Sequence, residues 1–146
     1  MKCRAGLLAV VVAITAGAAT AGCTEVEAPA QHVHQPAHLE PVEGTDLQQV
    51  NFDQRAAEQV ALQTATVERR GNHTVVPYAA LIYDGSGASW VYTSPEPLTY
   101  VRAAVEVARI VDDRVMLRNG PPVGTTVVTR GAAEVYGAEL EIAGGH

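Results

Sequence analysis

The spacing of apolar residues in the second half of the chain is that of β-strands. From Val75 onward, apolar residues recur at every second position in several short runs, the period of strands with one buried face. Residues that favour turns, Asp, Gly, Asn and Pro, separate these runs. The predicted strands cover residues 75–83, 89–93, 100–107, 114–118 and 125–129, and a last strand or short turn covers 132–142. The pattern predicts a mainly β fold, a small antiparallel β-roll or barrel-like domain.

One short helix is predicted between Phe52 and Thr66. Asp53 stands where its carboxylate can accept hydrogen bonds from the amides of a first helical turn. Small residues then recur along one stripe, which would pack closely on a sheet. With this helix, the β domain is expected to occupy residues 51–146.

The stretch before the helix is polar and rich in Pro, Glu and Gln. It holds almost no large apolar residue, so it should not bury enough surface to fold. We expect residues 23–50 to form a disordered polar tether.

The first 22 residues have the composition of an export signal. Lys2 and Arg4 precede an apolar run, and Thr20-Ala21-Gly22 stand directly before Cys23. The run is shorter than the ~20 residues that a membrane-spanning helix needs. This arrangement resembles the bacterial lipobox, in which a signal peptidase cuts before the cysteine and the cysteine sulfur carries lipid. The resemblance implies a lipoprotein signal peptide over 1–22 and a mature chain anchored through lipidated Cys23 to the extracytoplasmic face of the cell membrane. An ordinary cleaved secretory signal is the alternative.

The acidic charge balance argues against polyanionic partners. Sixteen acidic residues and eight arginines follow residue 22, a formal net charge of −8, against −6 for the whole chain. Nucleic acid and anionic lipid head groups would be repelled by such a protein. Cys3 lies in the leader and Cys23 is expected to carry lipid, so no disulfide is expected and an apolar core must supply the stability.

Four stretches of the β region resemble one protein family in their residues and order. They are Val-Pro-Tyr-Ala-Ala-Leu-Ile-Tyr-Asp-Gly at 76–85, Ser-Trp-Val-Tyr at 89–92, Val-Arg-Ala-Ala-Val-Glu-Val at 101–107, and Gly120 with Gly-Thr-Thr-Val-Val-Thr-Arg-Gly-Ala at 124–132. The family is that of the periplasmic adaptor subunits, the membrane fusion proteins of resistance-nodulation-division and related efflux pumps. The similarity is to the C-terminal part of the family's proteins and covers roughly Val75 to Glu139 of this chain. A weaker similarity to the segment that precedes the family's hairpin domains covers Phe52 to Val67.

This resemblance implies the membrane-proximal domain of an adaptor, where the two ends of the family's chain meet. Here only a few residues separate the two segments, so we expect a miniature form without the α-helical hairpin, the lipoyl-like domain and the β-barrel domain. The implied function is a non-catalytic, accessory or adaptor-like binding domain that works with a membrane efflux transporter. Its implied contacts are the membrane, through the lipid anchor, and an inner-membrane transporter subunit.

Trp90, Tyr92 and Tyr100 form the largest aromatic group in the β region. Such groups usually belong to a core, whereas an exposed portion would anchor a protein partner. These three residues are the predicted partner-binding site.

Metal binding is an alternative function, suggested by three histidines of the tether, His32, His34 and His38. Three imidazoles within seven residues can wrap a Cu(II), Ni(II) or Zn(II) ion. The alternative is an extracytoplasmic metal-binding or metal-delivering lipoprotein with Cu or Zn on the tether. A solvated linker that contains histidines is the other interpretation, and no other cofactor is expected.

No catalytic motif emerges from the sequence. Ser86, Ser89 and Ser94 lie near turns, without the surroundings of a nucleophile elbow. Asp112 and Asp113 are adjacent carboxylates at a predicted turn, where solvated side chains are the rule. We therefore expect a protein that is not an enzyme.

Overall fold

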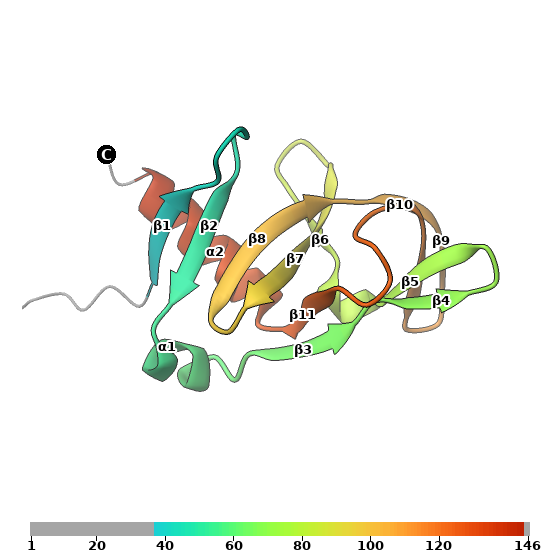
Figure 1. Cartoon of the computed structure of the whole chain (residues 1–146), viewed down its shortest axis with the longest axis horizontal. Coiled ribbons are helices and arrows are strands. Elements are labelled where there is room, and N and C mark those ends of the chain that lie inside the picture. Colours follow the sequence, from blue (N-terminus) through green and yellow to red (C-terminus); the bar gives the residue numbers. More distant parts are fainter. Residues whose placement is uncertain (1–36, 145–146) are drawn as a thin grey trace, which may run out of the picture. The chain divides into compact units, whose positions relative to one another are not determined.

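Strands dominate the computed structural model, which describes residues 37–144 (Figure 1). The strands are β1 (Ala37–Pro41), β2 (Gln48–Phe52), β3 (Gln63–Thr66), β4 (Glu68–Arg70), β5 (His73–Pro77), β6 (Ile82–Tyr83), β7 (Ser89–Glu96), β8 (Thr99–Ala104), β9 (Glu106–Val111), β10 (Arg114–Asn119) and β11 (Thr126–Arg130). The helices are α1 (Gln54–Gln59), the single 3-10 turn η1 (Tyr78–Ala80) and α2 (Ala132–Gly144). The prediction of a mainly β domain is confirmed.

The strands form two antiparallel sheets. The larger sheet has seven strands in the order β1-β2-β8-β7-β11-β3, and β6 pairs additionally with β7. The smaller sheet has the order β4-β5-β10-β9. Within the described residues each sheet ends in unpaired edge strands, so neither closes into a barrel.

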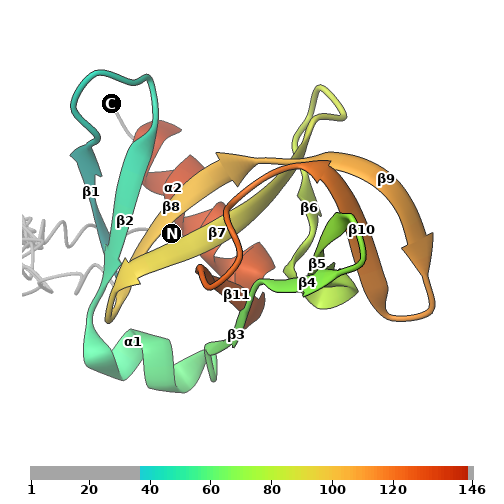
Figure 2. The same cartoon turned by 45° about the vertical axis from the view of Figure 1, so that its right-hand side comes forward.

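Two hydrophobic clusters hold these layers together. One cluster lies where α2 packs against the larger sheet, along β1, β2 and β7 (Figures 1 and 2). The second joins the two sheets, and its members include Val91, Val115 and Val127. Neighbouring residues of one strand, Val127 and Val128, belong to different clusters, because successive side chains point to opposite faces. The larger sheet is therefore covered on both faces along β7 and β11.

The predicted strand over 100–107 is two strands in different sheets. β8 ends at Ala104, and after Val105 the chain continues as β9 of the smaller sheet. Val105 is buried, and its amide donates to the Ser89 carbonyl. The alternation continues through this point, so the pattern alone gives no sign of the change of sheet.

The predicted helix is shorter than expected but begins where expected. The Asp53 carboxylate accepts a hydrogen bond from the Ala56 amide at 2.7 Å, as a capping residue does. The helix ends at Gln59, and Ala61 then adopts a left-handed φ of +50°, which turns the chain into β3.

Part of the predicted tether is folded, which corrects its C-terminal limit. Residues 37–41 and 48–52 form an antiparallel hairpin, and β2 also pairs with β8. Ala37, Val50 and Phe52 are buried against the α2 layer. The polar composition of the whole stretch concealed these few apolar residues. The hairpin that they form is stabilised by strand pairing and packing with segments distant in sequence. Residues 23–36 of the predicted tether lie outside the described residues.

The last predicted strand or turn is instead a helix. Ala, Glu and Leu, which are good helix formers, prevail in α2. Ala132, Val135 and Glu139 form its buried stripe at the spacing of a helix. Gly131 precedes it with a φ of +84°, and its carbonyl accepts the Val135 amide. Val135 and Tyr136, which favour strands, made the sequence pattern ambiguous here.

The predicted leader and Cys23 also lie outside the described residues. In the part that the structure describes, neither α1 nor α2 has the length and apolar character of a membrane-crossing helix.

Candidate functional site

Trp90 lies on β7, directly after a tight loop that the sequence predicted. Asp84 opens this loop, and one of its carboxylate oxygens accepts the amides of Ser86 and Ala88 and the Ser86 hydroxyl. The other oxygen accepts the indole Nε1 of Trp90 at 2.9 Å. These bonds, led by those from Ser86 and Trp90, lower the pKa of Asp84 to about 2. The loop is thus fastened to the edge of the tryptophan ring.

The face of the Trp90 ring is covered by an arginine from β8. The guanidinium carbon of Arg102 lies 4.9 Å from the ring centroid of Trp90 and 5.9 Å from that of Tyr136 on α2. Both distances are within the range of cation–π attraction. Arg102 therefore joins an aromatic ring of the sheet to one of the helix.

The same guanidinium is paired with a buried carboxylate. Arg102 Nη2 lies 3.0 Å from Glu139 Oε1, and the other oxygen of Glu139 accepts the Tyr92 hydroxyl. Glu139 is only 3% exposed, and Tyr92 is fully buried. Burial and the bond to Glu139 raise the pKa of Tyr92 above its usual range, so the hydroxyl stays protonated and donates. Both Glu139 oxygens are thereby engaged.

Tyr92 and Tyr100 belong to the core, which corrects the partner-binding role predicted for them. Tyr92 is inaccessible, and Tyr100 is 4% exposed with its ring edge-on to Phe52 at 5.9 Å. Both side chains are buried because they point to the face of the sheet that α2 covers. Only Trp90, which is half-buried, reaches the surface among the three predicted residues.

The accessible part of this region is a small surface of Tyr83, residues 84–88 and Trp90, which we call the Trp90 surface. Tyr83 is 51% exposed and pairs with Ser89 across the hairpin. An exposed tyrosine beside a fastened loop and a tryptophan edge has the composition of protein-binding sites. These groups can contact a protein partner through hydrogen bonds and aromatic packing.

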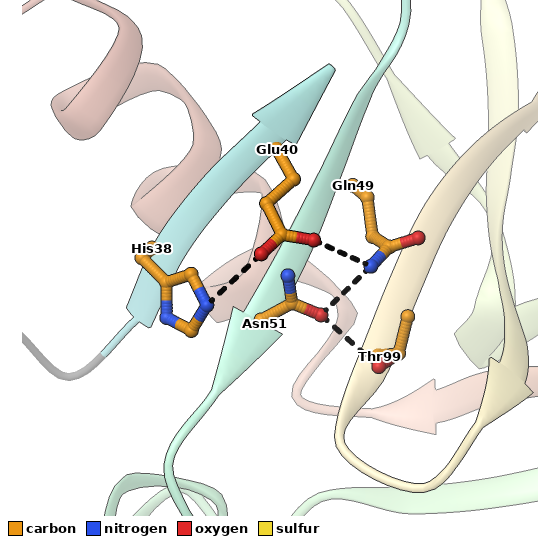
Figure 3. A network of polar contacts seen from close by, with 5 residues as sticks. All are labelled: His38, Glu40, Gln49, Asn51 and Thr99. Carbon is orange, nitrogen blue, oxygen red and sulfur yellow. Dashed lines mark hydrogen bonds and ion pairs between the residues drawn. The ribbon is translucent and has the colours of Figure 1, made fainter. Parts of the chain in front are cut away.

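His38 is the one predicted metal ligand within the described residues, and it lies on the exposed side of β1 (Figure 3). Its Nε2 is 3.7 Å from the carboxylate of Glu40. Gln49 donates to Glu40 and to Asn51, and the Thr99 hydroxyl also donates to Asn51. The network crosses β1, β2 and β8 at their polar face.

A metal centre is not assembled by the described side chains alone. Among residues 37–144, no group of three or more His, Cys, Asp or Glu side chains is placed to hold an ion. His32 and His34, the other predicted ligands, lie outside the described residues.

Sequence reasoning missed Arg102, Tyr136 and Glu139 as parts of one cluster. In the alternating pattern, Val101, Ala103 and Val105 share the side that is expected to be buried, so Arg102 is expected on the opposite side of the strand. No signal in the sequence identifies the cluster, because an arginine out of phase with the neighbouring valines is also typical of a solvent-facing strand position, and Tyr136 and Glu139 lie far along the chain. Comparison of the chain with protein-family models and with curated proteins gave no match.

Proposed function

We propose that this chain is a non-catalytic, extracytoplasmic, lipid-anchored binding domain that works beside a membrane efflux transporter, like the membrane-proximal domain of a periplasmic adaptor. The Trp90 surface would contact the transporter subunit. The anchor would be the lipid on Cys23.

One strand pairing carries this proposal. β3, from the upstream segment with the weaker resemblance, pairs antiparallel with β11, from the end of the stronger one. Ala65 lies opposite Val127, and Thr64 opposite Val128. In the adaptor family the two ends of the chain meet in the membrane-proximal domain, and under this proposal the β3–β11 pairing would correspond to that junction. One departure from the family lies in the loop between β10 and β11. Pro121-Pro122 follow Gly120 there, whereas Leu commonly follows this Gly in the family.

Site-specific crosslinking in the membranes of the host cell tests the proposal. A photoreactive phenylalanine would replace Tyr83 on the Trp90 surface. The matched control would replace Tyr78 of η1, which is equally exposed at 50%. We expect the Tyr83 position, and not the Tyr78 position, to capture an inner-membrane transporter subunit. Capture of no transporter subunit at the Tyr83 position would contradict the proposal.

One observation favours the metal-binding alternative. His38 presents an exposed imidazole beside the Glu40 carboxylate, a nitrogen and an oxygen donor that two further histidines would complete. Titration of the full chain with Cu(II) or Zn(II) tests it. The alternative requires affinity tighter than about micromolar that is lost in the His32, His34, His38 triple alanine variant. Binding that the triple variant leaves unchanged would show that these three histidines do not hold the metal.

A further inference from the structure

Positive charge gathers on the smaller sheet, although the chain as a whole is acidic. Five of the nine arginines lie in its four strands, which carry only two acidic residues, Glu68 and Glu106. These arginines are Arg69, Arg70, Arg109, Arg114 and Arg118. The net charge of the chain therefore does not describe the potential at this sheet, where anions would be attracted.

A β-bulge directs one of these arginines to a particular face. Met116 lies opposite Arg109, and the next residue of β10, Leu117, lies opposite Val107, so Ala108 is an extra residue of β9. Leu117 and Val107 pack into the core between the sheets. Without the bulge, Arg109 would share the core face with Val107, since their spacing of two places side chains on one side. The bulge instead points Arg109 away from the core, with Met116.

Three arginines meet on that outer face. Arg70 of β4, Arg109 of β9 and Arg114 of β10 line one open hollow of about 380 Å³. Val111 and the nearly buried Met116 supply its apolar lining, and Asp112 and Asp113 of the β9–β10 turn complete it. The arginines thus reach the hollow from three different strands.

The two aspartates offset part of the arginine charge of this hollow, and a formal charge of +1 remains. Among the described residues, neither Arg70 nor Arg109 has an ion pair or a side-chain hydrogen bond. Arg114 Nε lies 3.4 Å from Asp113, whose side chain is 82% exposed, and such a surface pair contributes little to stability. Three converging guanidinium groups repel one another, so a bound anion would relieve that repulsion.

We propose that this hollow binds the phosphate group of a small zwitterionic phosphodiester of the phosphoethanolamine type. The two unesterified oxygens of a phosphodiester lie in tetrahedral directions and each accepts more than one guanidinium hydrogen bond, so arginines from three strands can reach them. Asp112 and Asp113 at the rim would pair with the ammonium group of the same ligand. The ligand is either a soluble phosphodiester or a lipid head group, and for the latter the exposed Val111 supplies an apolar part of the lining.

Calorimetric titration of the full chain carrying Cys23→Ala, so that no attached lipid contributes, tests this site. The soluble probe is glycerophosphoethanolamine, and the membrane probe is a phosphatidylethanolamine–phosphatidylcholine vesicle assayed by co-sedimentation. We expect Arg70→Gln and Arg109→Gln each to weaken binding about tenfold, the effect of losing a charge-assisted hydrogen bond. Arg69→Gln is the matched control, because it removes the same charge from the neighbouring position of β4, outside the hollow.

The two probes separate the sources of the phosphate. Binding of glycerophosphoethanolamine supports a soluble ligand, whereas binding of the vesicle alone supports a lipid head group, provided that Arg70→Gln weakens it by about the same factor of ten. Binding of neither probe, or an equal loss with Arg69→Gln, would overturn the proposal. Circular dichroism of each variant shows whether it is folded. The test is independent of the transporter contact proposed above, since it involves other residues and no protein partner.

Discussion

Asp84 shows how much one side chain can organise over a few residues. Its carboxylate accepts four hydrogen bonds, from the loop and from Trp90. The sequence predicted this turn, because all partners lie within six positions and Asp-Gly-Ser-Gly is typical of turns. The Asp53 cap was predictable for the same reason. The bond from Tyr92 to Glu139 was not, since 47 positions separate the two residues.

Acidification should release Trp90 from Asp84 in a single step near pH 2. Hydrogen bonding lowers the pKa of Asp84 to about 2 from its ordinary 3.8. The ionised carboxylate therefore contributes to stability above about pH 4, and this contribution is lost as the pH falls toward 2. Trp90 is the only tryptophan, so its fluorescence reports this step directly.

The control for this titration is a second carboxylate on a loop. Asp84→Asn should remove the fluorescence step, because an amide does not titrate, whereas Asp113→Asn, at an exposed turn, should leave it in place. A step that persists unchanged in Asp84→Asn would assign it to another group.

At the scale of elements, α2 depends on a charged cluster as well as on apolar packing. Its buried stripe contains Glu139, whose partners Arg102 and Tyr92 come from two strands of the larger sheet. The sequence could not reveal this helix reliably, because its buried stripe includes a carboxylate that a simple apolar pattern would not expect. β1 and β2 were missed for a related reason, since strands this short are specified by their neighbours rather than by their own composition.

Removing the Glu139 carboxylate should destabilise the domain strongly. Glu139→Ala would leave Arg102 without its ion pair and Tyr92 without its acceptor, a loss of about 3–5 kcal/mol in the free energy of unfolding. Glu134→Ala, an exposed position of the same helix, should change that energy by less than about 0.5 kcal/mol. Urea unfolding of the full chain measures both, and equal losses would show that the cluster does not hold α2.

Across the whole molecule, alternation predicted the kind of fold but not its division into two sheets. The strands predicted over 89–93, 114–118 and 125–129 correspond to β7, β10 and β11, with limits that differ by a few residues at most. The crossing at Val105 and the pairing of β3 with β11 depend on contacts between distant segments, which periodicity does not encode. The hollow on the smaller sheet was missed likewise, because Arg70 is distant in sequence from Arg109 and Arg114, and because the net charge of the chain concealed their grouping.

The packing of α2 on β1 and β2 has a consequence for how the chain reaches its fold. These strands are the first elements of the described region, and the helix is the last. During synthesis the β1–β2 hairpin emerges long before the helix that covers its apolar face, and β3 must likewise wait for β11. Such long-range closure slows folding and leaves partial chains with exposed apolar surface. The larger sheet can therefore be covered by its helix only after residues 132–144 have been synthesised, so its first strands wait for the last described element.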